Sequence, residues 1–272
     1  MLASVRSAVL VGVDAYPVLV EVHVASQGLP TYNLVGLPDT VVREARERLR
    51  AAIVSSGLDW PPRRITVNLA PSGLPKRGAG LDLPAALGIL AAAGDLPPAA
   101  LEDTGVIGEL GLDGTVRPVA GTLALVDGLR QAGATSVLVP MAAAAEAALV
   151  EGVRVLPCRS LGEVRECLKG EQPWPDPPPP SAMEATEAEP DGPTADLGVV
   201  RGLTGARRAL EVAVAGGHHL LLVGPPGAGK TLLAHCLPSI LPPMTTAEAL
   251  EVTKIHSAAG RPVGGALLRA RP

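Results

Sequence analysis

Short apolar runs alternate with stretches of helical periodicity along residues 1–170, a pattern typical of strands that alternate with helices. Runs of β-branched and aliphatic residues predict strands over 7–13, 17–24, 32–37, 63–71, 105–110, 116–121, 136–140 and 153–157. Apolar positions three and four residues apart predict helices over 40–56, 81–94, 123–133, 142–150 and 160–168. A turn around Asp14 and Ala15 separates the first two strands and predicts an antiparallel pair. The order of elements predicts an α/β domain with a mixed sheet.

Asp39 and Asp82 stand at the starts of two predicted helices. Short acidic side chains at such positions accept hydrogen bonds from the first helical N–H groups, so both are predicted to be caps. The helix that follows Asp39 also has a charged face, in which Glu44 and Arg48 are spaced to pair one turn apart. We interpret this face as solvated surface rather than as a binding site.

The composition allows a large core made of aliphatic side chains. Of the 272 residues 47% are hydrophobic, yet Phe is absent and only two Trp and two Tyr occur. No apolar run approaches the ~20 residues of a membrane span, and the N-terminus lacks the basic start and cleavage site of a signal peptide. Cys158, Cys167 and Cys236 lack the spacing of a metal site or a disulfide framework. We therefore expect a cytoplasmic protein with free thiols in its core and no membrane contact.

Charge and composition divide the chain into three parts. Residues 171–196 hold seven acidic and no basic residues and are rich in Pro, which predicts a disordered acidic linker. Residues 197–272 hold eight basic and three acidic residues. The predicted organisation is one domain over 1–170, the linker over 171–196, and a second domain over 197–272.

The second domain carries the phosphate-binding loop pattern G-x-x-x-x-G-K-[ST], in the sequence GPPGAGKT. The apolar run 220–223 before the loop predicts a buried parallel strand, and the apolar residues after it predict a helix. Glycines let backbone N–H groups face phosphate oxygens at a helix N-terminus, the lysine reaches the outer phosphates, and the threonine hydroxyl ligates Mg²⁺. A plain Gly/Pro turn gives no reason for the Lys-Thr pair. The predicted contacts to ATP are Gly224, Pro225, Pro226, Gly227, Ala228, Gly229, Lys230, Thr231 and Leu232, with Thr231 also the predicted ligand of Mg²⁺.

Hydrolysis of ATP needs further groups, an acidic metal partner at the end of another strand and usually an arginine finger. After Thr231 the only carboxylates are Glu248 and Glu251, in a stretch whose pattern is helical. We therefore expect this chain to be the front part of a longer ATPase. It would bind nucleotide but could not hydrolyse it alone, and no catalytic residue is assigned.

Two stretches, IGELGLDGTVRPVAGTLALVDGLRQAGATSVLVP and VRVLPCRSLGEV, resemble the proteolytic domain of the Lon family. That family cleaves peptides with a Ser-Lys dyad, a hydroxyl nucleophile activated by an amine. Here the lysine position falls on Leu123, and the serine position falls on Gly80 in the loop PKRGAG. The resemblance implies a Lon-like scaffold that is not a protease. Ser72 and Lys76 form a less favoured replacement pair.

Three further stretches are long enough to be specific: YNLVGLPDTVVREARERLRAAIVSSG, RRITVNLAPSGLPKRGAGLDLPAALGIL and RGLTGARRALEVAVAGGHHLLLVGPPGAGKT. With them, nearly all of the chain outside the linker resembles the magnesium-chelatase-like AAA+ ATPases of the YifB/ComM family. The resemblance implies a Lon-protease-like mixed α/β domain, then the first part of a P-loop AAA+ α/β domain that uses ATP and Mg²⁺. It also implies a homohexameric ring that acts on DNA, as a branch-migration helicase in competence-related recombination. The family usually has Gln where Leu203 stands, in the segment near the adenine.

Two other functions remain open at this point. The first is a magnesium-chelatase-type subunit that uses ATP to drive metal insertion into a porphyrin. The second is a non-catalytic scaffold or oligomerisation fragment.

A basic patch is a further candidate site, made by Arg63, Arg64, Lys76 and Arg77. Such a cluster would give weak, salt-sensitive contact with phosphates. We favour the alternative of a solvated loop at a strand-helix junction. Trp60 is the nearest aromatic residue, so the sequence gives little support for base stacking beside these cations.

Overall fold

The computed structural model describes residues 1–178, 195–261, 263, 265–269 and 271. The chain forms two compact units, one of residues 1–182 with 253–266 and one of 183–252 with 267–272. Most of the expected linker, 179–194, lies outside the described residues. None of the described helices is long and apolar enough to cross a bilayer.

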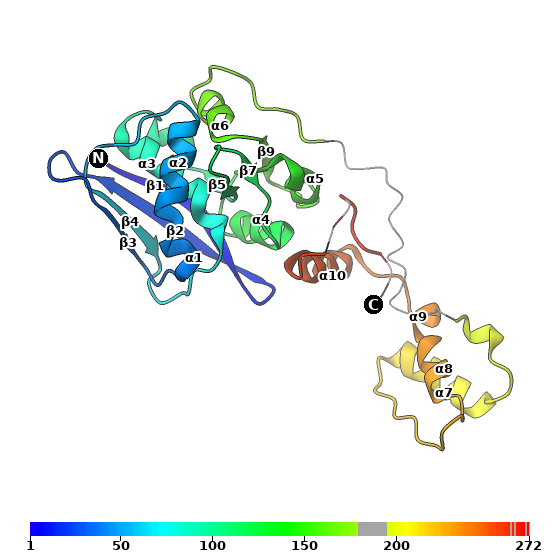
Figure 1. The fold of residues 1–272 in the computed structure, drawn as a ribbon. Helices are drawn as coiled ribbons and strands as arrows, with labels where there is room; N and C mark the ends of the chain where they lie inside the picture. The colour runs from blue at the N-terminus through cyan, green and yellow to red at the C-terminus, as the bar shows by residue number, and fades with distance from the viewer. Residues whose placement is uncertain (179–194, 262, 264, 270, 272) are drawn as a thin grey trace. The chain divides into compact units, whose positions relative to one another are not determined.

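The larger unit is built on a seven-stranded sheet in the order β3-β4-β2-β1-β5-β8-β9 (Figure 1). β1 pairs with β2 and β2 with β4 in antiparallel register, whereas the remaining neighbours are parallel. β6 and β7 form a separate antiparallel pair. The predicted mixed α/β class is thereby confirmed. The strands are β1 (Leu2–Val11), β2 (Asp14–Val24), β3 (Tyr32–Val35), β4 (Ile65–Ala70), β5 (Thr104–Val106), β6 (Glu109–Leu110), β7 (Val116–Arg117), β8 (Ser136–Pro140) and β9 (Arg154–Cys158).

The first hairpin turns two residues earlier than predicted. Val11 is paired with Asp14, so Gly12 and Val13 make the turn and the expected turn around Asp14 and Ala15 is wrong. Gly12 has φ 68°, a left-handed conformation that glycine adopts without steric cost. The position of this glycine therefore sets the register of the pair.

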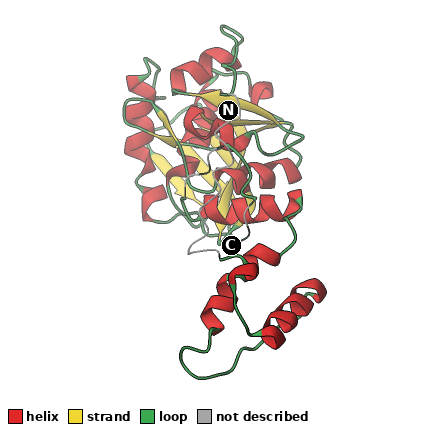
Figure 2. Ribbon diagram, turned by 90° about the vertical axis from the view of Figure 1, so that its right-hand side faces the viewer, coloured by secondary structure: helices red, strands yellow, loops and turns green. Residues whose placement is uncertain are grey.

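Helices of the larger unit follow the predicted periodicity, and they surround the strands in Figure 2. α3 is apolar on nearly all sides and is almost entirely buried, as expected of a helix without a polar face. It packs on β1 and β2, and a Cβ added at Gly88 would lie 2.6 Å from Val22 Cγ2. The helices are α1 (Thr40–Arg43), α2 (Ala45–Ser55), α3 (Asp82–Ala93), α4 (Thr122–Gln131), α5 (Ala144–Ala147) and α6 (Leu161–Leu168).

The two predicted caps have different outcomes. Asp39 is a cap, because its carboxylate accepts a hydrogen bond of 2.8 Å from Val42 N. Asp82 is not a cap; it is the first residue of α3, and its carboxylate accepts bonds from Arg48 Nε at 2.9 Å and Nη2 at 3.1 Å. The prediction failed because the side chain of Asp82 is only 3% exposed, so its charge requires a cation. Arg48 therefore faces Asp82 and not the solvated surface that its spacing from Glu44 predicted.

This ion pair also changes the titration of both groups. Burial raises the pKa of Asp82, and the hydrogen bond from Arg48 opposes that rise. The same hydrogen bond raises the pKa of Arg48. The arginine thus offsets part of the cost of burying this carboxylate between α2 and α3.

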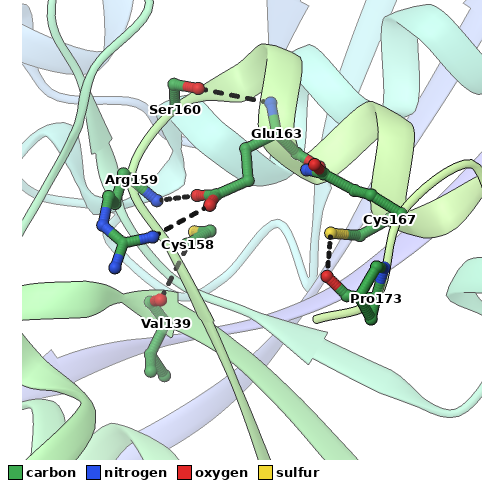
Figure 3. A network of polar contacts seen from close by, with 8 residues as sticks. Val139, Cys158, Arg159, Ser160, Glu163, Cys167 and Pro173 are labelled. Atoms are coloured by element: carbon green, nitrogen blue, oxygen red, sulfur yellow. Dashed lines mark hydrogen bonds and ion pairs between the residues drawn. The ribbon is translucent and has the colours of Figure 1, made fainter. Parts of the chain in front are cut away.

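The thiols of the larger unit are free and buried, as expected. Cys158 donates to the carbonyl oxygen of Val139 at 3.3 Å, and Cys167 donates to that of Pro173 at 3.5 Å (Figure 3). Burial raises the pKa of both thiols. Both thiols are therefore core groups kept in the protonated form.

The first residues of the expected linker are held on the larger unit, because Trp174 packs against its hydrophobic core.

The smaller unit has a small core of its own. Its helices are α7 (Thr204–Gly216), α8 (Lys230–His235), α9 (Leu237–Ile240) and the first part of α10 (Thr246–Ala258), whose residues from Thr253 onward group with the larger unit. Five buried side chains form the core: Leu197, Val200, Leu210, Leu233 and Cys236.

The strand predicted before the phosphate-binding loop is not formed. Residues 220–223 have no strand structure, and the side chains of Leu221 and Val223 are 85% and 84% exposed. A strand needs a hydrogen-bonded neighbour, and the described residues of the smaller unit include no other strand (Figure 2). An apolar run alone is therefore not enough to form a strand at residues 220–223.

We predict that Arg48→Met lowers the free energy of unfolding by about 3 kcal/mol, because it leaves the carboxylate of Asp82 buried without a cation. Urea unfolding measures this change. The matched control is Arg46→Met on the same helix, whose side chain is 49% exposed and whose replacement should cost less than about 0.5 kcal/mol.

The deficit of Arg48→Met should shrink as the pH falls through the pKa of Asp82. That pKa is raised in the folded state, so the folded protein binds the proton more readily than the unfolded chain does. Equal losses for the two variants, or a deficit that grows toward low pH, would contradict this account.

Candidate nucleotide-binding site

The loop at 224–231 has a conformation that its glycines make possible. Gly227 and Gly229 have φ of 77° and 81°, in the left-handed region that side chains with a Cβ disfavour. Ala228 N donates to Pro225 O at 3.3 Å and closes a turn within the loop. α8 begins immediately afterwards, at Lys230. The loop and helix of the predicted motif are therefore present, although the strand before them is not.

The ammonium group of Lys230 is bound to the loop itself. Its Nζ donates to Gly224 O and to Pro225 O, each at 2.7 Å. Two neutral carbonyl oxygens thus hold a full positive charge at the start of the loop. Phosphate oxygens are stronger acceptors for an ammonium than carbonyl oxygens are, so this group is available for exchange.

Thr231 lies in the first turn of α8, and its side chain is exposed. Mg²⁺ in nucleotide sites uses few protein ligands and takes the rest from phosphates and water. Among the described residues there is no group of three or more His, Cys, Asp or Glu side chains that could hold a metal ion. The hydroxyl of Thr231 beside an ammonium and a glycine-rich turn fits Mg²⁺ bound together with a phosphate.

Leu203 lies against the end of the loop, in the segment expected near the adenine. A Cβ added at Gly229 would lie 3.0 Å from Leu203 Cδ1. Leu203 has a left-handed φ of 50°, and its side chain is 43% exposed. Arg207 Nη1 donates to Val200 O at 3.2 Å across the same turn. An apolar, partly exposed side chain therefore stands beside the loop where an amide was expected.

Glu248, one of the two carboxylates after the loop, has a structural role. Its carboxylate accepts from Thr245 N at 2.8 Å and from Thr245 Oγ1 at 3.0 Å, which makes a capping box at the start of α10. Arg271 Nη2 lies 3.1 Å from the same carboxylate. Hydrogen bonds from Thr245 lower the pKa of Glu248. A helix cap is not the strand-end acid that ATP hydrolysis requires, in agreement with the sequence.

In the larger unit, Gly80, at the expected serine position, lines a cavity of about 380 Å³ together with Val119. A Cβ added at Gly80 would lie 3.4 Å from Val119 Cγ1, an ordinary van der Waals contact, so there is room for a side chain at this position. Leu123, at the expected lysine position, is completely buried. A hydroxyl and an amine are absent from these two described positions, as the sequence indicated.

Lys76 is not part of a solvated basic patch, and its amine is bonded to the carbonyl oxygen of the residue before Ser72. Its side chain is completely buried, its Nζ donates to Pro71 O, and burial lowers its pKa. Arg77 and Arg63 line different cavities. The less favoured basic patch is therefore incomplete, because Lys76, one of its four cations, lies inside the protein.

Comparisons with known proteins give matches in two parts of the chain. Residues 20–143 match a family described as subunit ChlI of Mg-chelatase, and residues 196–272 match magnesium chelatase, subunit ChlI. The chain is 43% identical to an uncharacterized protein of Mycobacterium tuberculosis, over 96% of this chain and 50% of that protein. It is 42% identical to the uncharacterized protein YifB of Salmonella typhimurium, over 94% of this chain and 49% of that protein. It is 39% identical to the competence protein ComM of Haemophilus influenzae, over 94% of this chain and 50% of that protein.

These matches extend through both units of the chain. The chain spans about half the length of the curated relatives that it matches. From the level of identity, together with the two ChlI matches, the chain belongs to the magnesium-chelatase-like family that includes YifB and ComM.

Proposed function

We propose that residues 224–231 bind the phosphates of ATP together with Mg²⁺, within an ATP-driven motor protein that acts on DNA. Membership of the magnesium-chelatase-like family supports an ATPase-type function. The observation that carries the proposal is the ammonium of Lys230, held at 2.7 Å from two carbonyl oxygens of a loop with left-handed glycines.

Each group of the loop has a distinct task in this proposal. Backbone N–H groups at the start of α8 donate to phosphate oxygens, and the partial positive charge of the helix terminus adds to the attraction. Lys230 exchanges its carbonyl partners for the outer phosphates. The hydroxyl of Thr231 holds Mg²⁺, which supplies positive charge to the phosphates when it is bound.

Cleavage of the terminal phosphate requires groups from elsewhere. Glu248 is engaged as a helix cap, and no metal-binding cluster of acidic side chains occurs among the described residues. We place the acidic metal partner in further residues of a longer protein and the arginine finger in a neighbouring subunit of a ring, expected to be a homohexamer. Two subunits would then complete each site.

DNA is the proposed substrate of the motor. One relative is named a competence protein, and the choice of DNA as the proposed substrate rests on this relationship. A second candidate is metal insertion into a porphyrin, because both family matches carry the description of a magnesium chelatase subunit. The two candidates share the ATP site and differ in what the ATPase responds to.

We predict that Lys230→Ala weakens binding of Mg-ATP by about 10- to 150-fold, because charge-assisted hydrogen bonds to phosphate are lost. Isothermal titration calorimetry of the 272-residue chain measures the affinity. The control is Lys169→Ala, a lysine that pairs with Glu171 in the larger unit and should leave the affinity unchanged. Equal affinity of the Lys230 variant and the unmodified chain would refute the assignment of the site.

We predict that forked or branched DNA raises the rate of ATP hydrolysis severalfold in a protein of the relatives' length that contains this chain. Steady-state phosphate release measures the rate, with a porphyrin and Mg²⁺ as the parallel addition. A response to the porphyrin and none to any DNA would favour the chelatase candidate over the DNA motor.

A further inference from the structure

A cavity of about 430 Å³ lies in the larger unit, and its lining includes no residue of the phosphate-binding loop or of the cavity at Gly80. Three segments form it: residues 30–32 at the start of β3, the outward face of α2, and the loop 58–63 that precedes β4 (Figure 1). Its volume falls within the range of about 300–1,000 Å³ that is usual for ligand pockets. The side chains that line it combine aromatic rings with arginines.

The aromatic part consists of Tyr32 and Trp60, two of only four aromatic residues in the chain. Their ring centroids are 6.3 Å apart with an interplanar angle of 35°. Both rings are partly buried and pack against the hydrophobic core, so they are held in place rather than free to turn. Burial also raises the pKa of Tyr32, which keeps its hydroxyl neutral. The cavity therefore has a fixed, uncharged aromatic wall.

The cationic part consists of Arg46 and Arg50 on α2 and Arg63 in the loop. Arg46 and Arg50 are one helical turn apart, where like charges destabilise a helix. Among the described residues, the only ion pair found for these three joins Arg46 Nε to the exposed Glu47 at 3.7 Å. Asp59 also lines the cavity, but one carboxylate does not balance three guanidinium groups, so positive charge remains in excess. Three exposed guanidinium groups thus face the same space as the rings.

We propose that this cavity binds a nucleotide unit of single-stranded nucleic acid. A base would stack on Trp60 and Tyr32, and the adjoining phosphates would pair with Arg50, Arg63 and Arg46. A duplex hides the faces of its bases, and the side chains of Asp and Glu have no ring to stack on the aromatic wall. Stacking joined to cationic contact with the backbone is the usual chemistry of single-strand binding, and it needs no particular base sequence.

The test uses the full 272-residue chain and short oligothymidylate or oligouridylate, followed by tryptophan fluorescence and by anisotropy of a labelled oligonucleotide. The double variant Arg50→Gln/Arg63→Gln should weaken binding at least about tenfold, through the loss of charge-assisted bonds to phosphate. It should also lower the slope of log K against log salt by about 1.4, for two lost phosphate contacts. Arg43→Gln/Arg154→Gln is the matched control, because both arginines are exposed and lie outside the cavity.

Stacking has its own readout. Trp60→Leu should weaken binding about 5- to 100-fold and abolish the quenching of tryptophan fluorescence by the oligonucleotide. If this variant unfolds, as circular dichroism would show, the exposed arginine variants still decide the outcome. Tighter binding of the deoxy- or the ribo-oligomer supports the proposal in either case and tells DNA from RNA.

Three results would overturn the proposal. The first is equal affinity of the two double arginine variants, and the second is binding without a change in Trp60 fluorescence. The third is polyglutamate binding as tightly as the oligonucleotide, which would make the cavity a site for acidic peptides. Lys230→Ala should bind the oligonucleotide normally, so a failure here and a failure of the ATP site are distinguishable.

Discussion

The ion pair between Arg48 and Asp82 joins α2 to the buried start of α3. Asp82 begins the buried helix α3, and its carboxylate has Arg48 of α2 as its cation. Residues two apart on a helix point in nearly opposite directions, since each residue turns the helix by about 100°. With Arg48 turned toward α3, Arg46 and Arg50 must face outward. A buried charge thus fixes where two exposed charges stand, and the proposed nucleic-acid cavity depends on that arrangement.

The sequence predicted what local periodicity encodes and missed what contacts between distant segments decide. The mixed sheet, the helices and the cap at Asp39 follow from spacing alone. Asp82 was misassigned because an aspartate at a helix start has the same appearance whether it caps or pairs with a distant arginine. Lys76 likewise resembled a surface cation until its surroundings were known. The cavity around Tyr32 and Trp60 could not be predicted, because its three segments are separated by other elements of the chain.

The candidate ATP site shows the same division on a smaller scale. Its glycine turn and the start of α8 form without other strands, because left-handed glycines and a helix terminus are local features. The apolar run 220–223 needs a neighbouring strand, and it has none among the described residues of the smaller unit. The motif itself therefore encodes the shape of the loop, whereas a strand before the loop depends on pairing with another segment.

The bonds from Lys230 to Gly224 and Pro225 have a thermodynamic consequence. An anion that enters the loop takes over an ammonium that is already ordered, so little side-chain entropy is lost at that moment. The two carbonyl oxygens are exposed to water, and hydration can replace the donor they give up. Binding of the anion is then an exchange of hydrogen-bond partners around a preorganised cation. The net enthalpy of binding is the difference between the bonds that form and the bonds that break.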